Sequence, residues 1–177
     1  MSKAKMATVW LDGCSGCHMS FLDIDERLIT LADLADLVYS PLVDTKEFPD
    51  MVDVTLIEGA VSNEDDYEKI LKVRDHTKIL VSLGDCAVTA NVPGMRNPFK
   101  PEALLERAYV ENADKNQHIP VKVIPPLREM SVPVHQVVKV DVFVPGCPPS
   151  ADTIFYVVTE LLAGREPDLT GKTRFGA

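Results

Sequence analysis

The sequence predicts an α/β protein built on a doubly wound parallel sheet, and three observations carry this prediction. Short apolar runs alternate with segments whose apolar residues recur at helical spacing, which is typical of parallel strands joined by helices. Residues 78–84 (KILVSLG) are nearly all apolar, as expected of a central strand covered on both faces. A long proline-rich stretch precedes the last predicted strand. Together these features indicate a flavodoxin-like sheet with an insertion before its last strand.

The first half of the chain gives three predicted strands and one helix. Residues 6–11 (MATVWL) form an apolar run that ends at a turn-forming Asp-Gly step, and we expect Trp10 to lie in the core. Residues 37–43 (LVYSPLV) predict a second strand that a proline stops, and residues 51–60 (MVDVTLIEGA) alternate as a third. The helix between the first two strands is indicated by residues at helical spacing, namely Phe21, Ile24, Leu28, Leu31 and Ala35.

The second half continues the alternation. Ser62 is the expected N-cap of a helix whose first turn is acidic. Residues 78–84 follow as a strand, and residues 137–146 (VVKVDVFVPG) are the last strand, in which we expect Phe143 to be buried. The final helix follows the sequence GCPPS and ends at Gly164, a good helix terminator.

The stretch 91–136 interrupts this rhythm and is the predicted insertion. It contains one expected helix near residues 101–111 and seven prolines, at positions 93, 98, 101, 120, 125, 126 and 133. An irregular insertion of this length inside a compact domain is usually functional. At 177 residues the chain is predicted to form a single domain, 1–177, with its core at about 6–164 and a polar tail at 165–177.

Composition limits the classes of partner. The formal net charge of −9 disfavours nucleic acid and anionic membrane surfaces, both of which require clustered Lys and Arg. The sequence has no apolar run long enough for a membrane span and no secretion signal. We therefore expect a cytoplasmic protein whose thiols stay reduced, which disfavours a disulfide framework.

The four cysteines are the residues that indicate chemistry. Cys14 and Cys17 follow the first predicted strand, Cys86 follows the strand at 78–84, and Cys147 follows the last strand. The loops beyond the carboxyl ends of parallel strands gather at one edge of the sheet, so these thiols are expected to meet there. Four converging thiolates are the ligand set of a structural zinc ion or an iron–sulfur cluster.

Other interpretations of the same cysteines remain open from the residues alone. Cys86 taken alone is equally well a small buried hydrophobic residue. A Cys-x-x-Cys pair after a first strand is also the thioredoxin-like pattern, so a thiol–disulfide oxidoreductase using Cys14 and Cys17 is an alternative. Because Cys86 and Cys147 occupy the same strand-end position as the pair, a shared metal or cluster site is favoured, with zinc as one possibility.

Four runs of the sequence closely resemble the small subunit of [NiFe]-hydrogenases. They are LDGCSGCHMSFLDIDERL, IEGAVS, LGDCAVTANVPGMRN and VPGCPPSADTI. The similarity is greatest to the short small subunits of cytoplasmic NAD-reducing enzymes and extends over about residues 8–164. It implies a flavodoxin-like fold and one proximal [4Fe–4S] cluster bound by Cys14, Cys17, Cys86 and Cys147. The cluster-bearing subunit of respiratory complex I is a further relative, but it typically has an adjacent Cys-Cys pair that CSGC lacks.

The resemblance also implies the role of the chain within a larger oxidoreductase. H₂ would be split at a Ni–Fe centre on a partner large subunit, and this chain would pass electrons toward a diaphorase module whose subunits bind iron–sulfur clusters, FMN and NAD. NADP or another carrier fits these residues equally well. Glu58, at the end of the third predicted strand, is a candidate proton relay, with a loop or helix-capping carboxylate as the alternative. We expect His18 to be an exposed histidine in the first turn of a helix, with donation to a cluster sulfur or to a partner carboxylate as the alternative.

Overall fold

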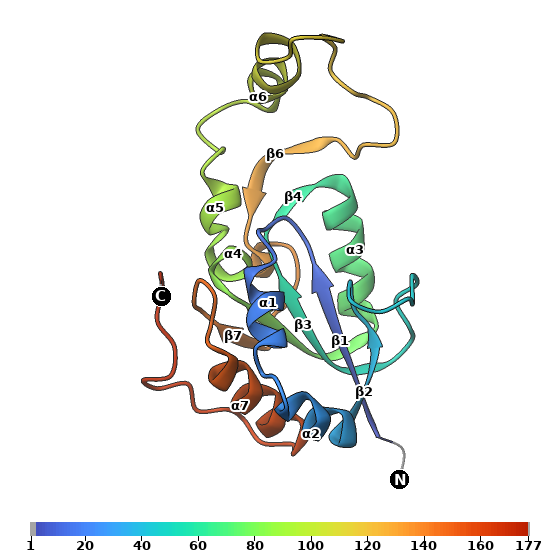
Figure 1. Ribbon diagram of the computed structural model, residues 1–177, viewed down its shortest axis with the longest axis vertical. Coiled ribbons are helices and arrows are strands. Elements are labelled where there is room, and N and C mark those ends of the chain that lie inside the picture. The colour runs from blue at the N-terminus through green and yellow to red at the C-terminus, as the bar shows by residue number, and fades with distance from the viewer. Residues whose placement is uncertain (1–2, 177) are drawn as a thin grey trace.

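A five-stranded parallel sheet forms the centre of the molecule in a computed structural model that describes residues 3–176 (Figure 1). Its strands are β1 (Ala4–Trp10), β2 (Ala35–Tyr39), β3 (Val52–Glu58), β5 (Thr77–Leu83) and β7 (Val142–Val144). Their spatial order is β2-β1-β3-β5-β7, and every pair of neighbours is parallel. When only the five strands of this sheet are numbered along the chain, the order becomes 2-1-3-4-5, which is the order of flavodoxin-like sheets.

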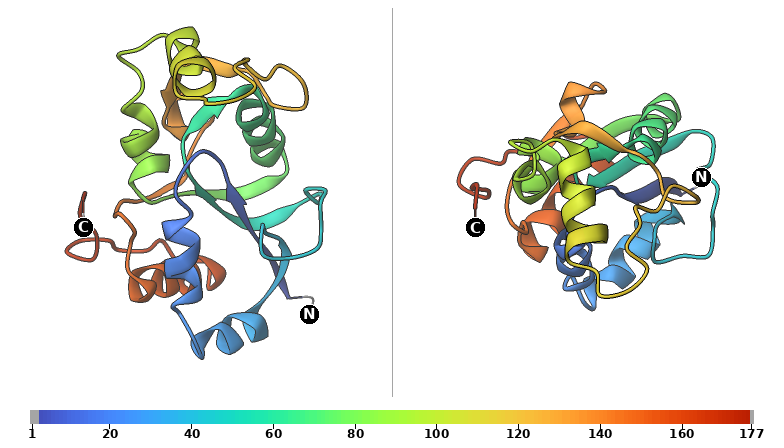
Figure 2. Two further views of the ribbon diagram at one scale, coloured as in Figure 1. Left: turned by 45° about the horizontal axis from the view of Figure 1, so that its top comes forward. Right: turned by 90° about the horizontal axis from the view of Figure 1, so that it is seen from above.

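Helices cover both faces of the sheet. The helices α1 (Gly16–Leu22), α2 (Arg27–Leu34) and α7 (Ala151–Leu162) pack on one face, and α3 (Glu64–Asp75) packs on the other (Figures 1 and 2). Successive strand residues enter opposite cores, so that Leu56 belongs to the first apolar cluster and Ile57 to the second. Within residues 3–176, none of the helices has the length and apolar character needed to cross a membrane.

The predicted strands are confirmed, with shorter bounds at the last one. β7 pairs with β5 over three residues only, although the apolar pattern indicated residues 137–146. The prediction that Trp10 and Phe143 are core residues is wrong, because they are 46% and 40% exposed. Trp10 ends β1 where the strand leaves the sheet, and Phe143 lies in an edge strand with its ring against that of His135.

Two helix predictions also need correction. The helical pattern from Phe21 to Leu31 is divided between two helices, and Ala35, predicted at the end of the helix, begins β2. Asp25 between the helices has a left-handed backbone, with φ of 60°, that interrupts the helical path. Ser62 is not an N-cap but lies in the short strand β4 (Val61–Asn63). Asn63 caps α3 instead, because its side chain accepts a hydrogen bond of 2.9 Å from the Asp66 amide.

The insertion is more regular than the prolines indicated. It contains α5 (Asn91–Gly94), α6 (Pro101–Glu106), the π-helical turn η1 (Arg107–Glu111), β6 (Leu127–Val132) and the 3₁₀ turn η2 (Val134–Gln136). The helix expected near 101–111 is thus present as α6 and η1. β6 pairs antiparallel with β4, so the insertion returns to the body through a second, two-stranded sheet that was not predicted. Residues 1, 2 and 177 of the predicted domain lie outside the described residues.

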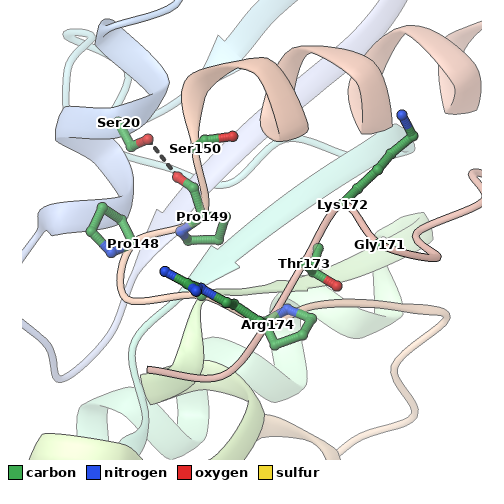
Figure 3. Close-up of a pocket in the computed structure, with 10 residues that line it drawn as sticks. Ser20, Pro148, Pro149, Ser150, Gly171, Lys172, Thr173 and Arg174 are labelled. Carbon is green, nitrogen blue, oxygen red and sulfur yellow. Dashed lines mark hydrogen bonds between the residues drawn. The ribbon is translucent and has the colours of Figure 1, made fainter. Parts of the chain in front are cut away.

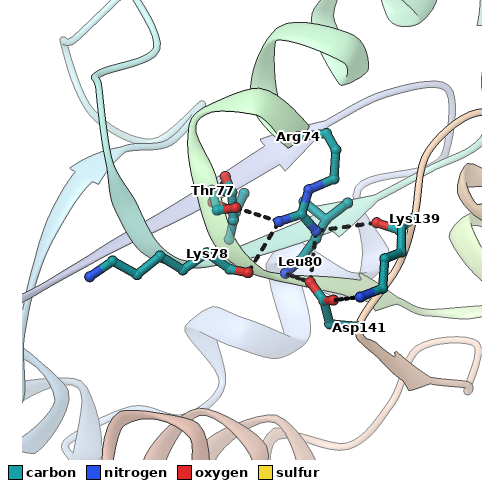
Figure 4. A network of polar contacts seen from close by, with 7 residues as sticks. Arg74, Thr77, Lys78, Leu80, Lys139 and Asp141 are labelled. Carbon is teal, nitrogen blue, oxygen red and sulfur yellow. Dashed lines mark hydrogen bonds and ion pairs between the residues drawn. The ribbon is translucent and has the colours of Figure 1, made fainter.

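An ion-pair network joins α3, β5 and the segment before β7 at the amino end of the sheet (Figure 4). Arg74 donates to the Asp141 carboxylate at 2.7 Å and to the carbonyl oxygens of Lys139 and Lys78 at 3.2 and 3.1 Å. The Leu80 amide donates to the same carboxylate at 2.9 Å. Partial burial opposes the charged form of Asp141, but the hydrogen bonds from Leu80 and Arg74 outweigh it and hold the pKa of this carboxyl below its ordinary value.

This network predicts a pH-dependent contribution to stability. A carboxyl whose pKa is lowered by folding stabilises the protein above its unfolded pKa of about 4, and the contribution is lost as the pH falls through the folded value. We expect Asp141→Asn to lower the free energy of unfolding by about 1–2 kcal/mol at pH 7. Urea unfolding should show that the difference from the wild type shrinks below about pH 4. Asp33→Asn, a change at an exposed carboxylate on α2, is the control and should have little effect at either pH.

Candidate functional site

The four cysteines lie at the carboxyl edge of the sheet, as predicted. Cys14 is in the loop after β1, Cys17 is in the first turn of α1, Cys86 is in α4 (Asp85–Thr89) directly after β5, and Cys147 is in the loop between β7 and α7. All four are free thiols; Cys17 and Cys86 are buried, whereas Cys14 and Cys147 are exposed. Three separate chain segments therefore contribute sulfur atoms to one place.

The two buried thiols have raised pKa values because of burial and of the charges around them. Burial raises the pKa of the Cys17 thiol, and the negative charges of Glu58 and of the other three cysteines raise it further. Burial also raises the pKa of Cys86, with smaller contributions from Cys14, Cys147 and Glu58. Thiols with raised pKa values stay protonated near neutral pH unless positive charge stabilises their thiolate form, and a bound metal ion supplies such charge.

Gly84 is the point at which the cysteine segments meet most closely. Its backbone is left-handed, with φ of 82°, and an added Cβ would overlap the Cys17 sulfur and lie 3.4 Å from the Gly146 carbonyl oxygen. Only glycine combines this backbone conformation with so close an approach. Gly84 thus allows the turn after β5 to lie between α1 and the Cys147 loop.

Asp85 fastens the Cys86 and Cys147 segments together. Its carboxylate is 4% exposed and accepts a hydrogen bond of 2.7 Å from the Gly146 amide, while its own amide donates to the Gly146 carbonyl oxygen at 2.8 Å. The other carboxylate oxygen accepts from the Gly176 amide at 2.7 Å, so the C-terminal segment is attached as well. The sequence prediction missed Asp85, because an acidic residue between a glycine and a cysteine gives no signal of burial.

The Cys147 loop is also held from the side of α1. Ser20, one turn after Cys17, donates a hydrogen bond of 2.5 Å to the Pro149 carbonyl oxygen (Figure 3). A pocket of about 410 Å³ lies between this loop and the C-terminal segment, and Arg174 lines it close to the two prolines (Figure 3). The backbone around Cys147 is therefore fixed from two directions.

Two hydrogen-bond donors from α5 reach the sulfur atoms. The Val92 amide donates to Cys86 and opposes the rise of its pKa, and Asn91 Nδ2 lies 3.6 Å from Cys147 Sγ. Donors of this kind stabilise negative charge on sulfur and tune the reduction potential of a bound metal centre. Sequence pattern indicated neither residue, since both lie in the insertion.

Glu58 lies beside the cysteines at the end of β3 and is 2% exposed. Its Oε2 accepts a hydrogen bond of 3.0 Å from the His18 amide and contacts the His18 ring nitrogen Nδ1. The other ring nitrogen lies 3.0 Å from Thr8 Oγ1, and the Thr8 hydroxyl donates to Ser40 Oγ at 2.7 Å. A continuous buried chain of polar groups therefore leads from Glu58 to the end of β2.

The expectation that His18 is exposed is wrong, because only 6% of it is accessible. The ring points from α1 onto β1, where Thr8 and Glu58 provide partners for both ring nitrogens. The spacing of apolar residues along the helix could not reveal the burial of His18, since its partners come from β1 and β3. The β1–β3 register, which sets Trp10 opposite Glu58, is what brings the carboxylate to the histidine.

Comparisons with known proteins agree with this arrangement. Residues 14–161 match the family described as NADH ubiquinone oxidoreductase, 20 Kd subunit. The NAD-reducing hydrogenase HoxS subunit delta of Cupriavidus necator is 42% identical over 172 residues, which cover 94% of this chain and 82% of the relative. The chain belongs to the [NiFe]-hydrogenase small-subunit family. The resemblance seen in the cysteine-containing runs is thereby confirmed.

Solved structures give the same assignment for this small subunit. It superposes on a chain of a crystal structure of NAD⁺-reducing [NiFe]-hydrogenase in the H₂-reduced state with a TM-score of 0.93 and 39% identity, covering 98% of this chain and 99% of the other. A [NiFeSe]-hydrogenase of Dm. baculatum matches at 20% identity with a TM-score of 0.59, which shows likeness of fold alone.

Other relatives are longer than this small subunit. One of the F420-non-reducing hydrogenase subunits of Methanocaldococcus jannaschii is 39% identical over 95% of this chain, but the match spans only 59% of the relative. The chain thus spans little more than half the length of several curated relatives it matches.

The contact at Gly84 gives a matched pair of substitutions. Gly84→Ala adds a Cβ in the left-handed region and against the Cys17 sulfur, so we expect a loss of about 3 kcal/mol in the free energy of unfolding. Gly164→Ala has a similar φ, 72°, but no atom within 4 Å of the added Cβ, and should cost only about 1 kcal/mol. Denaturant unfolding measures both, and equal losses would show that the contact with Cys17 has no effect.

Proposed function

We propose that this chain is the electron-transfer small subunit of a cytoplasmic NAD-reducing [NiFe]-hydrogenase. It carries one [4Fe–4S] cluster, bound by Cys14, Cys17, Cys86 and Cys147, between the Ni–Fe centre of a large subunit and a diaphorase module with iron–sulfur, FMN and NAD sites. The complete complex catalyses H₂ + NAD⁺ = NADH + H⁺. The observation that carries the proposal is the convergence of four thiols from three chain segments at one edge of the sheet.

The choice of NAD as the final acceptor rests on two comparisons. The relative from Cupriavidus necator, which is named as NAD-reducing, is 42% identical to this chain. The NAD⁺-reducing crystal structure has a chain on which this one superposes with a TM-score of 0.93 and 39% identity. The sequence identity and the superposition therefore support an NAD-linked complex.

The donor set fits an iron–sulfur cluster better than a zinc ion. Four thiolates around one zinc would lie within about 4 Å of each other. Among residues 3–176, no group of three or more Cys, His, Asp or Glu side chains lies close enough together to hold a single metal ion. A cluster of four irons binds each cysteine at a different metal and accepts wider spacing. The hydrogen-bond donors Asn91 and Val92 suit sulfur ligands of such a cluster.

When bound, the cluster accepts and releases one electron at a time. The residues of this chain fix its surroundings. Gly84 and Asp85 lock the relative positions of the cysteine segments, so that little reorganisation is needed when the charge changes. Buried Cys17 and Cys86 form the inner side of the site, and exposed Cys14 and Cys147 form the side that faces partner subunits. This asymmetry provides an insulated interior and an open route for electrons.

A thiol–disulfide oxidoreductase that uses Cys14 and Cys17 is the alternative function. A nucleophilic thiol of that class requires a lowered pKa, because the thiolate is the reactive form. Burial and neighbouring negative charge instead raise the pKa of Cys17. The presence of Cys86 and Cys147 at the same edge, which disulfide exchange by Cys14 and Cys17 does not require, further favours metal ligation.

Iron analysis tests the proposal directly. We expect the chain, purified anaerobically in its complex, to be brown with about four irons and four sulfides per copy of this subunit. Cys86→Ala removes one proposed ligand and should remove most of that iron. Cys86→Ser, measured in the same way, shows whether a serine oxygen can replace the sulfur as a ligand. A colourless chain with stoichiometric zinc, or a metal-free chain that reduces insulin disulfides, would contradict the proposal.

Glu58 is proposed as a proton relay of the same complex. It is buried among the cysteines, accepts from the His18 amide, and begins a chain of polar groups through His18 and Thr8 to Ser40. Protons can move along such a chain because each member both donates and accepts. The alternative, a carboxylate that only caps the first turn of α1, uses the same amide contact and requires no proton transfer.

Glu58→Gln separates these roles. Glutamine keeps the hydrogen bond to the His18 amide but cannot bind and release a proton, so we expect H₂/D⁺ exchange by the assembled hydrogenase to fall by at least about tenfold. The EPR signal of the reduced cluster should stay unchanged. Glu68→Gln, at an exposed position on α3, is the control. Exchange at the wild-type rate in Glu58→Gln would show that Glu58 is structural only.

A further inference from the structure

The insertion forms an arm without a core of its own. Between Ala90 and Ser131, both buried, not one residue of the described chain is buried. The stretch is nevertheless rich in apolar side chains, several of which are largely exposed: Met95 at 73%, Phe99 at 58%, Val121 at 82%, Ile124 at 49% and Met130 at 52%. We name residues 99–130 the arm. Apolar exposure of this extent in one segment marks a surface that another molecule covers.

The arm is also hollow. A cavity of about 600 Å³ lies between α6 with η1 and the returning chain, and Leu104, Tyr109, Ile119 and Val121 are among the residues that line it. Figure 1 shows α6 and the return loop rising from the body as two limbs of the arm. The hollow is lined largely by apolar residues that are themselves exposed, such as Val121 and Ile124, so apolar side chains of another molecule can enter between the two limbs.

The base of the arm, in contrast, is firmly attached. Arg96 donates to the carbonyl oxygens of Ser62 and Arg128 at 2.9 Å each. Asn97 both accepts from the Ser131 amide and donates to the Ser131 carbonyl oxygen, at 2.8 Å each, as a neighbouring strand would. The arm is therefore presented in a fixed direction and is not a loose loop.

The direction of the arm relates it to the cysteines. It leaves the body after α5, whose Asn91 contacts the Cys147 sulfur and whose Val92 amide donates to Cys86. The arm rises beyond the carboxyl ends of the strands (Figures 1 and 2). The cysteine segments follow β1, β5 and β7 at this same edge of the sheet. A partner that approaches the cysteine edge closely enough for electron transfer meets the arm as part of the same surface.

The comparisons indicate which partner this is. Relatives named as NAD-reducing, F420-non-reducing, coenzyme F420 and sulfhydrogenase subunits all align with 92–97% of this chain, a span that includes the arm. These names differ in the electron acceptor and share hydrogenase activity. The subunit that complexes with different acceptors have in common is the hydrogen-activating one, so a surface beside the cysteine edge is expected to face that subunit and not the acceptor module.

We propose that the arm is a docking surface for the hydrogenase large subunit, whose apolar side chains complete the arm's missing core. This proposal rests on the proposed function, because it requires a large subunit at the cysteine edge. The arm would then widen the interface beyond the cysteine loops toward the size of obligate interfaces, about 2,000 Å² or more. Val121 and Ile124 would be central contacts, since both line the hollow and are exposed in the isolated chain.

Co-purification of the assembled complex tests the docking surface. The subunits are co-expressed with an affinity tag on the large subunit, and the amount of this chain per large subunit is measured by mass spectrometry. We expect Val121→Asp combined with Ile124→Asp to lower that ratio at least about tenfold. The matched control is Ile29→Asp, which changes a 70% exposed residue on α2 at the other end of the molecule and should leave the ratio unchanged.

A second measurement separates the docking surface from the proposed function. With the tag moved to this chain, iron per chain should be equal in the wild type, the arm variant and the control. The docking proposal is wrong if the arm variant still co-purifies with the large subunit. It is also wrong if the variant loses only the diaphorase subunits, loses only its association with a second copy of this chain, or loses its iron. A wild-type chain without iron would instead contradict the proposed function, whatever the arm binds.

Discussion

The arrangement of the site depends on one close approach, the contact of the Gly84 backbone with the sulfur of Cys17. Parallel register brings the ends of β1, β5 and β7 to one edge, but it only brings the loops near each other. The missing side chain at Gly84 lets them touch, and the Asp85 carboxylate then binds the Gly146 amide across the gap. Without that contact the thiols would belong to three independent loops, and the geometry needed for a shared metal centre would be lost.

Much of the fold was predictable from local pattern. The apolar runs at β1, β3 and β5 and the helical spacing of α7 are strong periodic signals, and the cysteines follow strand ends that any parallel sheet gathers together. The β4–β6 pair was not predictable, because it joins Val61 to Val132 across the insertion. β4 has only three residues, and the six residues of β6 (LREMSV) do not alternate between apolar and polar. The division into a single domain and the ligand role of the four cysteines stay predictions.

The site residues that were missed share a physical cause. His18, Asp85 and Asn91 are polar residues whose partners come from other elements, and sequence periodicity reports only the face of the residue's own helix. The buried polar chain from Glu58 through His18 to Thr8 would be costly if any member lacked a partner. Each member has one, so the chain adds order to the core beside the cysteines and restricts the rotamers of the residues around it.

The way in which the arm joins the body has an evolutionary consequence. One end of the arm continues into β6, which pairs with β4, and the other end is held by the hydrogen bonds of Asn97 to Ser131 of β6, so the parallel sheet and its cysteine loops do not depend on how many residues the arm contains. Lengthening, shortening or replacing the segment between Asn97 and Leu127 would shift the register of no strand in the main sheet. This segment can therefore change in length while the main sheet and its cysteine loops keep their geometry.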